Sequence, residues 1–494
     1  MQIAKMNGIM MRQLPSMAKE NLSGECATNT DMGYVGRTTP GESSTPPDAR
    51  DRQGSTPAMA EEKRKVVILG GGLTGISAAI HLRRPWVLFE REAKLGGQAV
   101  TEERDGFRFD LTGHWLHLRD PAIKQLVAEV LPAEMVSVER RARIFSHGAT
   151  TLYPFQANLY GLPPDVIKEC LLGVIQAKMQ PAGASPRNFE EYCLRHFGAG
   201  ISRHFMIPYN QKLWGVHPRT ITADWCSRFV PLPDLEQVVA GAVGADAGRM
   251  GYNVNFLYPK QGGIETLARA LGARVRGGDV HLRSSVESLD FRKCEVVVAG
   301  QRVPYQSVVS TLPLPELLAR MSDLPDDIAA HASRLRCTTL RYLNVATRSP
   351  PAADWHWVYV PEKRLPFYRV GIYSNAVASM APAGAASLYV ELADRGPVSD
   401  ATLSDVAQGL TEIGAIAGPG DIRFADAHEI KYAYVVFDEY YYAATTAIFS
   451  FLESHAIYPR GRYGAWTYNA MEDCLLAGRE VAVTIEAVPG SKTP

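Results

Sequence analysis

The sequence predicts an α/β fold, and three observations support this prediction. An apolar, β-branched run at Val66–Leu69 leads into a glycine-rich turn, a short Ala/Ile-rich helix and a second apolar run at Trp86–Phe89. Strand-like segments return between Val280 and Pro313, and a helical pattern follows at about 471–481. Because short apolar runs are typical of strands buried in a parallel sheet, we expect a Rossmann-like three-layer domain that is discontinuous in sequence.

The expected fold divides the chain into four parts. A chain of 494 residues is long enough for two or three domain-sized units. We expect a tail, a three-layer domain assembled from separated segments, a mostly helical insertion and a mixed-sheet substrate domain. The expected bounds are 1–62 for the tail, 63–115 with 255–315 and 455–494 for the three-layer domain, 116–254 for the insertion and 316–454 for the mixed-sheet domain.

Residues 1–62 differ in composition from the rest of the chain. They carry clusters of Gly, Ser, Thr, Pro and Asp, such as Thr39–Pro47, and show no apolar periodicity. Such a segment buries too little apolar surface to offset its ordering entropy, so we expect disorder. It also lacks the continuous apolar region of a secretory signal. Met17, Met32 and Met59 offer alternative first residues, so our hypothesis is a mis-assigned start or a dispensable tail.

Composition argues against several classes of protein. Lys plus Arg and Asp plus Glu each number 52, so the zero net charge gives no support to a general affinity for nucleic acid or anionic membranes. No apolar stretch reaches the ~18 residues that a membrane span needs. The seven cysteines are scattered without a Cys-x-x-Cys pair, so we expect reduced thiols in a cytoplasmic protein without a metal site. The oligomeric state stays open, a homo-oligomer included.

The turn after the first strand matches Gly-x-Gly-x-x-Gly. The first glycine permits a tight turn, the second lets the backbone approach a pyrophosphate, and the third lets helix and strand pack closely. The helix N-terminus presents unpaired N–H groups and a partial positive charge to phosphates. The residues that we expect to bind a dinucleotide are Gly70, Gly72, Leu73, Thr74 and Gly75.

Glu90 ends the second strand, twenty residues after Gly70. An acid at this place is suited to a ribose diol, and it would repel the additional phosphate of NADP. In isolation Glu90 would be a solvated surface acid, but the order of strand, turn, helix and strand favours the ribose role.

A second glycine pair close behind Glu90 distinguishes an FAD-binding site from an NAD-binding site. The segment Arg91–Gln98 contains this pair and is followed by Gly106–His114. The order resembles the FAD-binding families that include amine oxidases, protoporphyrinogen oxidase and UDP-galactopyranose mutase, in which these residues run along the pyrophosphate and flavin. The resemblance therefore implies FAD contacts for Arg91, Gly96, Gly97, Gln98, Gly113 and His114.

Two distant segments are consistent with the same cofactor. In the resembling families, the strands around Val286 return to the nucleotide sheet and place this residue against the adenine. Gly461–Trp466 precedes a helix whose N-terminus would point at the N1/O2 edge of the flavin. A positive dipole there stabilises the anionic reduced flavin by at most ~2 kcal/mol. The resemblance adds to the FAD-binding residues Val286, Arg462, Glu472 and Asp473.

Five further blocks occur in the order seen in UDP-galactopyranose mutases, with the eukaryotic-type enzymes most similar. The blocks are Tyr153–Asn158, Phe205–Trp214, Tyr258–Gly263, Pro366–Arg369 and Gly461–Tyr468. The resemblance extends over most of the chain from about Lys65 to Val483. It implies a redox-neutral pyranose–furanose isomerisation of a nucleotide sugar with N5 of the reduced flavin as the nucleophile. NADH or NADPH would serve as a transient reductant.

The resemblance also assigns roles to single residues. His114 and Gly113 match the Gly-His loop at the flavin, although Thr112 stands where a glycine is usual. Arg369 matches the diphosphate arginine, and a bidentate guanidinium suits that anion. These three residues form the expected catalytic group, His114, Gly113 and Arg369. The expected substrate contacts are Tyr359, Tyr434, Tyr468, the uridine-side pair Tyr153 and Gln156, and Tyr192, which stands where the family has a tryptophan near the uracil.

Three departures from the family pattern affect the substrate end. Ile207 stands where a second diphosphate arginine is expected, and Phe145 replaces an arginine before the Tyr-Pro-Phe block. Loss of a charge-assisted contact to phosphate typically costs ~1.5–3 kcal/mol. The Asn-rich stretch before the last helix is shortened to Met471–Asp473, and Glu472 would add negative charge near a dianionic ligand. We therefore expect a pocket that is not tuned for UDP.

An FAD-dependent oxidoreductase of the amine oxidase or protoporphyrinogen oxidase type is the alternative function, and the lost arginines favour it. A non-enzymatic, flavin-stabilised scaffold is disfavoured, because holding FAD does not need a solvent-excluded pocket with mixed polar lining. Single residues also have simpler interpretations. Arg369 would be an ion-paired arginine, His114 a structural histidine, and Glu472 and Asp473 acids at a helix N-terminus.

Overall fold

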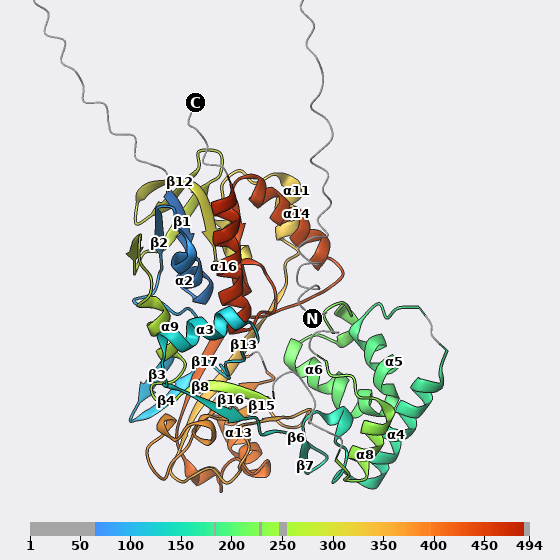
Figure 1. Cartoon of the computed structure of the whole chain (residues 1–494). Coiled ribbons are helices and arrows are strands. Elements are labelled where there is room, and N and C mark those ends of the chain that lie inside the picture. Colours follow the sequence, from blue (N-terminus) through green and yellow to red (C-terminus); the bar gives the residue numbers. More distant parts are fainter. Residues whose placement is uncertain (1–64, 182–183, 227–229, 247–253, 395, 489–494) are drawn as a thin grey trace, which may run out of the picture. The chain divides into compact units, whose positions relative to one another are not determined.

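A computed structural model describes most of the chain (Figure 1). The expectations for residues 1–62 lie outside the described residues. Among the residues that are described, no helix is long and apolar enough to cross a membrane. The described ranges, all within the unit Glu62–Pro494, are 65–181, 184–226, 230–246, 254–394 and 396–488.

The first strand lies inside a seven-stranded sheet. It runs parallel to its neighbours on both sides, with Val67 opposite Val308 and Val87. Val66–Leu69 is fully buried, which explains why this run is apolar without alternation. Across the sheet the strands are β10 (Val286–Asp290), β11 (Glu295–Val298), β12 (Gln301–Ser310), β1 (Lys65–Leu69), β2 (Trp86–Phe89) and β9 (Asp279–His281), with β18 (Ile457–Pro459) also paired to β12.

Helices cover both faces of this sheet. Val66 and Ile68 belong to one hydrophobic core, and Val67 and Leu69 belong to another. The sheet is therefore the middle of three layers, and the predicted α/β fold class is confirmed. The helices that share a core with Val66 are α2 (Leu73–His81), α3 (Pro121–Val130), α9 (Glu265–Gly272) and α16 (Met471–Ala487). Those that share a core with Val67 include α10 (Leu314–Ala319), α11 (Asp326–Ala332) and α14 (Tyr441–Ser454).

A second seven-stranded sheet has mixed topology. Most neighbours are antiparallel, but β6 joins β14 in parallel. The hairpin of β6 and β7 comes from within the segment 116–254, so this sheet includes strands from the expected helical insertion. Val406 and Leu410 of α13 (Asp400–Glu412) pack on the sheet. The strand order is β17 (Ile422–Val435), β13 (Cys337–Thr347), β16 (Ser387–Leu392), β15 (Phe367–Ile372), β14 (Trp357–Tyr359), β6 (Ala142–Ser146) and β7 (Ala149–Leu152).

A mainly helical region follows β7. Its two longest helices approach closely at glycines: a Cβ on Gly198 would lie 2.0 Å from Gly173 O. Gly198 has a φ of 72°, which interrupts α5. The elements are η1 (Phe155–Ala157), α4 (Pro164–Met179), α5 (Phe189–Ile201), the π-helix η2 (Ser202–Met206), α6 (Ile207–Trp214), η3 (Pro218–Thr220) and α8 (Leu235–Ala242).

The remaining elements are short. The two-stranded ribbons pair β3 (Thr101–Arg104) with β4 (Phe107–Asp110), and β5 (Met135–Glu139) with β8 (Asn255–Pro259). The short helices are α12 (Tyr373–Ala376), η4 (Ala378–Met380), η5 (Pro419–Asp421) and α15 (Gly461–Gly464).

Candidate active site

A cavity of about 1070 Å³ is lined by residues of both large sheets. The first sheet contributes residues that follow the carboxyl ends of its parallel strands, where ligands bind in doubly wound folds. The second sheet contributes side chains from β13 to β17. The expected site residues that line this cavity are Gly70, Gly72, Leu73, Thr74, Glu90, Arg91, Gly96, Gly97, Gln98, Gly113, His114, Val286, Tyr359, Arg369, Tyr434, Arg462, Tyr468 and Asp473.

Close backbone approaches shape the glycine turn after β1. Gly70 has a φ of 95°, and a Cβ on Gly75 would lie 2.0 Å from Gly70 O. Gly75 is thus placed for close helix packing and is not among the residues that line the cavity. The buried Glu90 carboxylate accepts hydrogen bonds from the N–H groups of Gly71 at 2.5 Å and Glu92 at 2.8 Å. These two bonds fix Glu90 at the end of β2, beside the turn.

The second glycine pair faces the same turn. Gly96 N–H donates to Gly71 O at 2.9 Å, and a Cβ on Gly97 would lie 2.9 Å from Gly72 Cα. Gly97 also has a φ of 61°, in the left-handed region that favours glycine. The two motifs therefore meet backbone to backbone. Beside them, Gln98 Oε1 is buried without a hydrogen-bond partner among the described residues.

The loop after β4 enters the cavity and is held by Tyr373 of α12, directly after β15 of the second sheet. Tyr373 Oη donates to Asp110 O and Thr112 O, both at 2.9 Å. Thr112 has a φ of 63°, a backbone conformation that suits the glycine usual at this position. A Cβ on Gly113 would lie 2.6 Å from Tyr389 Oη. The loop therefore has room for glycine at position 113 and no room for a larger residue.

His114 lies in this loop as a neutral imidazole. Burial lowers its pKa to about 4, and the positive charges of Arg462 and, more weakly, Arg369 act in the same direction. The backbone of Thr112 opposes this shift without reversing it. At neutral pH the ring carries no charge, and one of its nitrogens can donate a hydrogen bond while the other accepts one.

Arg369 is oriented by a buried carboxylate. Its Nε and Nη2 donate to the two oxygens of Glu391 at 2.8 and 2.5 Å, and Nη2 also donates to Tyr434 Oη at 3.1 Å. The Glu391 side chain is fully buried, whereas 21% of the Arg369 side chain is exposed. Burial acts to lower the pKa of Arg369, but Glu391 raises it, and the result lies well above the ordinary value. The guanidinium is charged, fixed in direction and largely compensated by its partner.

Aromatic side chains surround Arg369 and Arg462, two of the arginines that line the cavity. Tyr359 is the cross-strand neighbour of Arg369. The rings of Tyr434 and Tyr468 are stacked, with centroids 6.0 Å apart. Arg462 lies 4.6 Å from the centre of the Tyr468 ring and donates to two backbone carbonyls. Burial raises the pKa of Tyr359 and Tyr434, so both hydroxyls stay protonated at neutral pH and can donate hydrogen bonds.

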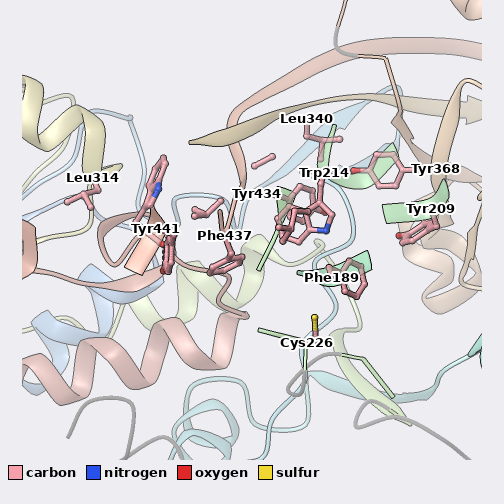
Figure 2. Close-up of a cluster of buried hydrophobic side chains, with 14 of the residues drawn as sticks. Phe189, Tyr209, Trp214, Cys226, Leu314, Leu340, Tyr368, Tyr434, Phe437 and Tyr441 are labelled. Carbon is pink, nitrogen blue, oxygen red and sulfur yellow. Dashed lines mark hydrogen bonds between the residues drawn. The ribbon is translucent and has the colours of Figure 1, made fainter. Parts of the chain in front are cut away.

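Three expected substrate contacts are not among the residues that line this cavity. Tyr153 packs against Tyr359, with ring centroids 5.3 Å apart. Gln156 is buried, and its Nε2 donates to Pro231 O at 2.8 Å. Tyr192 belongs to the hydrophobic core that Figure 2 shows in part. Tyr153 therefore adjoins the cavity through Tyr359, whereas Gln156 and Tyr192 lie outside its lining.

The acids at the start of α16 differ in position. Asp473 lines the cavity, and its side chain accepts a hydrogen bond from Ala470 N–H at 2.8 Å. Glu472 is buried, and its Oε1 accepts from the N–H groups of Arg119 and Asp120. Its negative charge is therefore engaged by the loop before α3 and does not face a ligand in the cavity.

The two positions that lack the expected arginines also lie away from the cavity. Ile207 begins α6 and lines a separate, smaller pocket with Arg203 and Gln211. Phe145, in β6, belongs to the hydrophobic core between the second sheet and α13. Neither position therefore places a second guanidinium beside Arg369.

Several cavity residues were missed by sequence reasoning. Tyr389 packs over Gly113 and Cys474 also lines the cavity, while Glu391 lies behind the lining and holds Arg369. One signal was available in Ser387–Leu392, where a glutamate interrupts an apolar strand that is buried throughout. A buried acid needs a cationic partner, but the sequence does not reveal that this partner is Arg369, which depends on the pairing of β15 with β16.

One family of known proteins matches most of this chain. The family model described as "Flavin containing amine oxidoreductase" matches residues 73–485. The chain belongs to this family. The match begins within the glycine turn and ends in α16, so it includes the second sheet, every strand of the first sheet except β1, and the cavity lining from Leu73 onward.

Several solved structures are similar to this chain. Reduced UDP-galactopyranose mutase is 26% identical with a TM-score of 0.81, over 86% of this chain and 94% of the other. A putative protoporphyrinogen oxidase from Exiguobacterium sp. 255-15 is 15% identical with a TM-score of 0.68, over 86% of this chain and 99% of the other. At this identity the similarity shows a shared fold and no more. Among curated proteins, pseudooxynicotine dehydrogenase from Pseudomonas sp. is 29% identical over 139 residues. That match spans 23% of this chain and 28% of the dehydrogenase.

The residues at the glycine turns fit the flavin cofactor that the family implies. The turn at Gly72 and Gly97 is a cradle that a Cβ would fill, since an added Cβ on Gly97 would lie 2.9 Å from Gly72 Cα. Glycines in such a turn let the backbone approach a pyrophosphate. The unpaired Gln98 Oε1 is a buried acceptor in need of a donor. The protein is a flavoenzyme whose FAD would occupy this cavity.

Proposed function

We propose that the chain acts as a mutase-like isomerase on a nucleotide sugar. The observation that carries the proposal is the arrangement of Arg369, Tyr359, Tyr434 and Tyr468 on one wall of the flavin cavity. A charged guanidinium of fixed direction, surrounded by tyrosine side chains, suits a diphosphate. The similarity to reduced UDP-galactopyranose mutase, at 26% identity over 94% of that chain, supports the same conclusion.

The protein groups in this proposal bind and orient the ligand. When bound in its reduced form, the flavin supplies a nucleophilic N5. Arg369 would bind the diphosphate and fix the position of the leaving oxygen. Tyr359 and Tyr434 would donate hydrogen bonds to the diphosphate. The neutral His114 would offer a hydrogen bond beside the flavin without adding charge. Isomerisation of this kind needs orientation more than a protein acid or base.

An amine-oxidising flavoenzyme is the second candidate. The observation that favours it is the absence of a second guanidinium from positions 207 and 145, since Ile207 and Phe145 face a separate pocket and a hydrophobic core. Glu391 compensates the charge of Arg369, which reduces the attraction for a dianion. Binding of a neutral amine does not depend on a second guanidinium, so the missing arginines would not weaken it.

Reduced enzyme distinguishes the two candidates. Under anaerobic conditions, the mutase proposal predicts that photoreduced protein converts UDP-galactopyranose to the furanose and that Arg369→Ala weakens UDP binding ten- to a hundredfold. This range corresponds to the ~1.5–3 kcal/mol of a charged hydrogen bond. Arg364→Ala is the matched control, because Arg364 lies exposed in the same hairpin and pairs with Glu412. Bleaching of the oxidised flavin by an aliphatic amine, with no turnover of any nucleotide sugar, would reject the mutase function.

The proposal has three further parts. We infer that NADH or NADPH reduces the flavin transiently, since the isomerisation requires reduced flavin and consumes no electrons. A cytoplasmic location and a homo-oligomeric state stay predictions from the sequence.

A further inference from the structure

Lys212 binds a ring of backbone carbonyls beside the ligand end of the cavity. Its Nζ donates to Val360 O at 3.1 Å, Glu362 O at 2.8 Å, Leu365 O at 3.1 Å and Phe367 O at 2.5 Å. Three of these acceptors lie in the connection between β14 and β15, and the fourth, Phe367, is the first residue of β15. An ammonium has three N–H donors that can be shared among them. One side chain of α6 therefore closes the whole connection.

The connection held by Lys212 adjoins two residues of the cavity. Tyr359 immediately precedes Val360, and Arg369 follows Phe367 by two residues, and the two face each other across β14 and β15. The ammonium thus binds one carbonyl at each end of the hairpin connection and two within it. The position of this hairpin determines where Tyr359 and Arg369 lie.

The same helix packs aromatic side chains against this end of the cavity. The Tyr209 ring lies 5.4 Å from the Tyr359 ring and 6.2 Å from the Tyr368 ring, between centroids. Trp214 lies 5.7 Å from Tyr434. Figure 2 shows Tyr209, Trp214, Tyr368 and Tyr434 in one cluster. Apolar contacts of this kind are not directional, whereas the carbonyl ring fixes the depth at which the helix docks.

Burial of the Lys212 ammonium is unfavourable by itself. Burial lowers its pKa to about 7, and the negative charge of Glu362 acts in the opposite direction. Val360, Leu365 and Phe367 are buried, so their carbonyls would lose a donor that water replaces poorly. An apolar side chain at position 212 would leave these acceptors without their shared donor.

We propose that Lys212 is a positioning residue that docks α6 on the β14–β15 hairpin and thereby sets the ligand affinity of Tyr359 and Arg369. The inference rests on the proposed function only for the identity of the ligand. The docking itself is independent of whether that ligand is a nucleotide sugar. It follows that the carbonyl ring is a site for a small ammonium ion once the lysine side chain is removed.

Amide hydrogen exchange on the flavin-loaded enzyme tests the docking. In Lys212→Ala, amides of residues 360–369 should exchange at least tenfold faster, while the amides of β1 keep their protection. Methylammonium should restore protection, and tetramethylammonium, which has no N–H donor, should not. Lys363→Ala is the matched control, because Lys363 is an exposed lysine of the same connection, and it should change nothing.

The outcomes separate the docking from the proposed function. Unchanged exchange, equally increased exchange throughout the protein, or equal rescue by tetramethylammonium would overturn the docking role. If Lys212→Ala does not fold, Lys212→Arg keeps the donors and must retain protection at residues 360–369, and its loss would also overturn the role. UDP titration should show at least a tenfold loss of affinity in Lys212→Ala with methylammonium rescue. Absence of UDP binding in the wild type would reject the nucleotide-sugar function and leave the exchange result standing.

Discussion

At the scale of single residues, Asp110 is a buried acid that stabilises the loop carrying Gly113 and His114. Its carboxylate accepts hydrogen bonds from Thr101 Oγ1 at 2.6 Å, Tyr258 Oη at 2.5 Å and Ile264 N–H at 3.1 Å. Burial nevertheless raises its pKa from 3.8 to about 7, with the hydrogen bonds acting in the opposite direction. The folded protein therefore retains a proton on Asp110 at pH values where the unfolded chain has lost it.

This raised pKa predicts how stability depends on pH. Between pH 4 and pH 7 the folded state binds more protons than the unfolded state, so Asp110 makes stability fall as pH rises, by up to about 1.4 kcal/mol per pH unit. Asp110→Asn should flatten this part of the profile, measured by denaturant unfolding at several pH values. Asp405→Asn, at an exposed position on α13, should keep the wild-type slope. An unchanged slope in Asp110→Asn would contradict the assignment.

At the scale of elements, one carboxylate ties α16 to the loop before α3. Glu472 lies in the first turn of α16 and accepts hydrogen bonds from two backbone N–H groups of that loop and from Arg119 Nε at 3.2 Å. The negative charge also lies at a helix N-terminus, where it is favourable. The loop continues back to His114 in the cavity, so this contact connects two cavity walls that are distant in sequence.

Loss of this contact should loosen the flavin site. Glu472→Ala leaves two backbone donors without an acceptor, and we expect a loss of stability of about 2–6 kcal/mol, summed from ~1–3 kcal/mol per unsatisfied group. The protein should also lose FAD more readily during gel filtration, which absorbance at the flavin maximum measures. Glu480→Ala, exposed on the same helix, serves as the control and should keep its flavin. Equal flavin content in the two variants would contradict the proposed link.

Elements also mark how far the sequence could predict the structure. Local patterns predicted β1, the glycine turn, α2 and β2, because burial in a parallel sheet requires apolar runs and close packing requires glycine. The partners of Glu391 and Glu472 could not be predicted, because each depends on strand pairing or on a loop far away in sequence. Resemblance predicted a ligand role for Arg369, which stays a prediction. The ion-paired interpretation is confirmed, since Glu391 holds this arginine.

At the scale of the whole molecule, the cavity draws its walls from both large sheets. Gly72, Glu90 and Val286 come from the first sheet and the segments that adjoin it, and Tyr359 and Arg369 come from the second. A ligand that fills the cavity contacts all of these walls at once. Bound FAD should therefore stabilise the two sheets together and not the first sheet alone.

Calorimetry with and without FAD tests this coupling. Free FAD at a hundred times its dissociation constant should stabilise the folded protein by about 2.7 kcal/mol, and the unfolding of both sheets should move to higher temperature together. Gly97→Ala should largely abolish the shift at the same FAD concentration, because its Cβ would lie 2.9 Å from Gly72 Cα where the pyrophosphate is expected. If FAD moved one transition and left a second in place, the sheets would respond separately. That result would contradict the predicted coupling of the two sheets through the cavity. It would not contradict binding of the cofactor at the glycine turn.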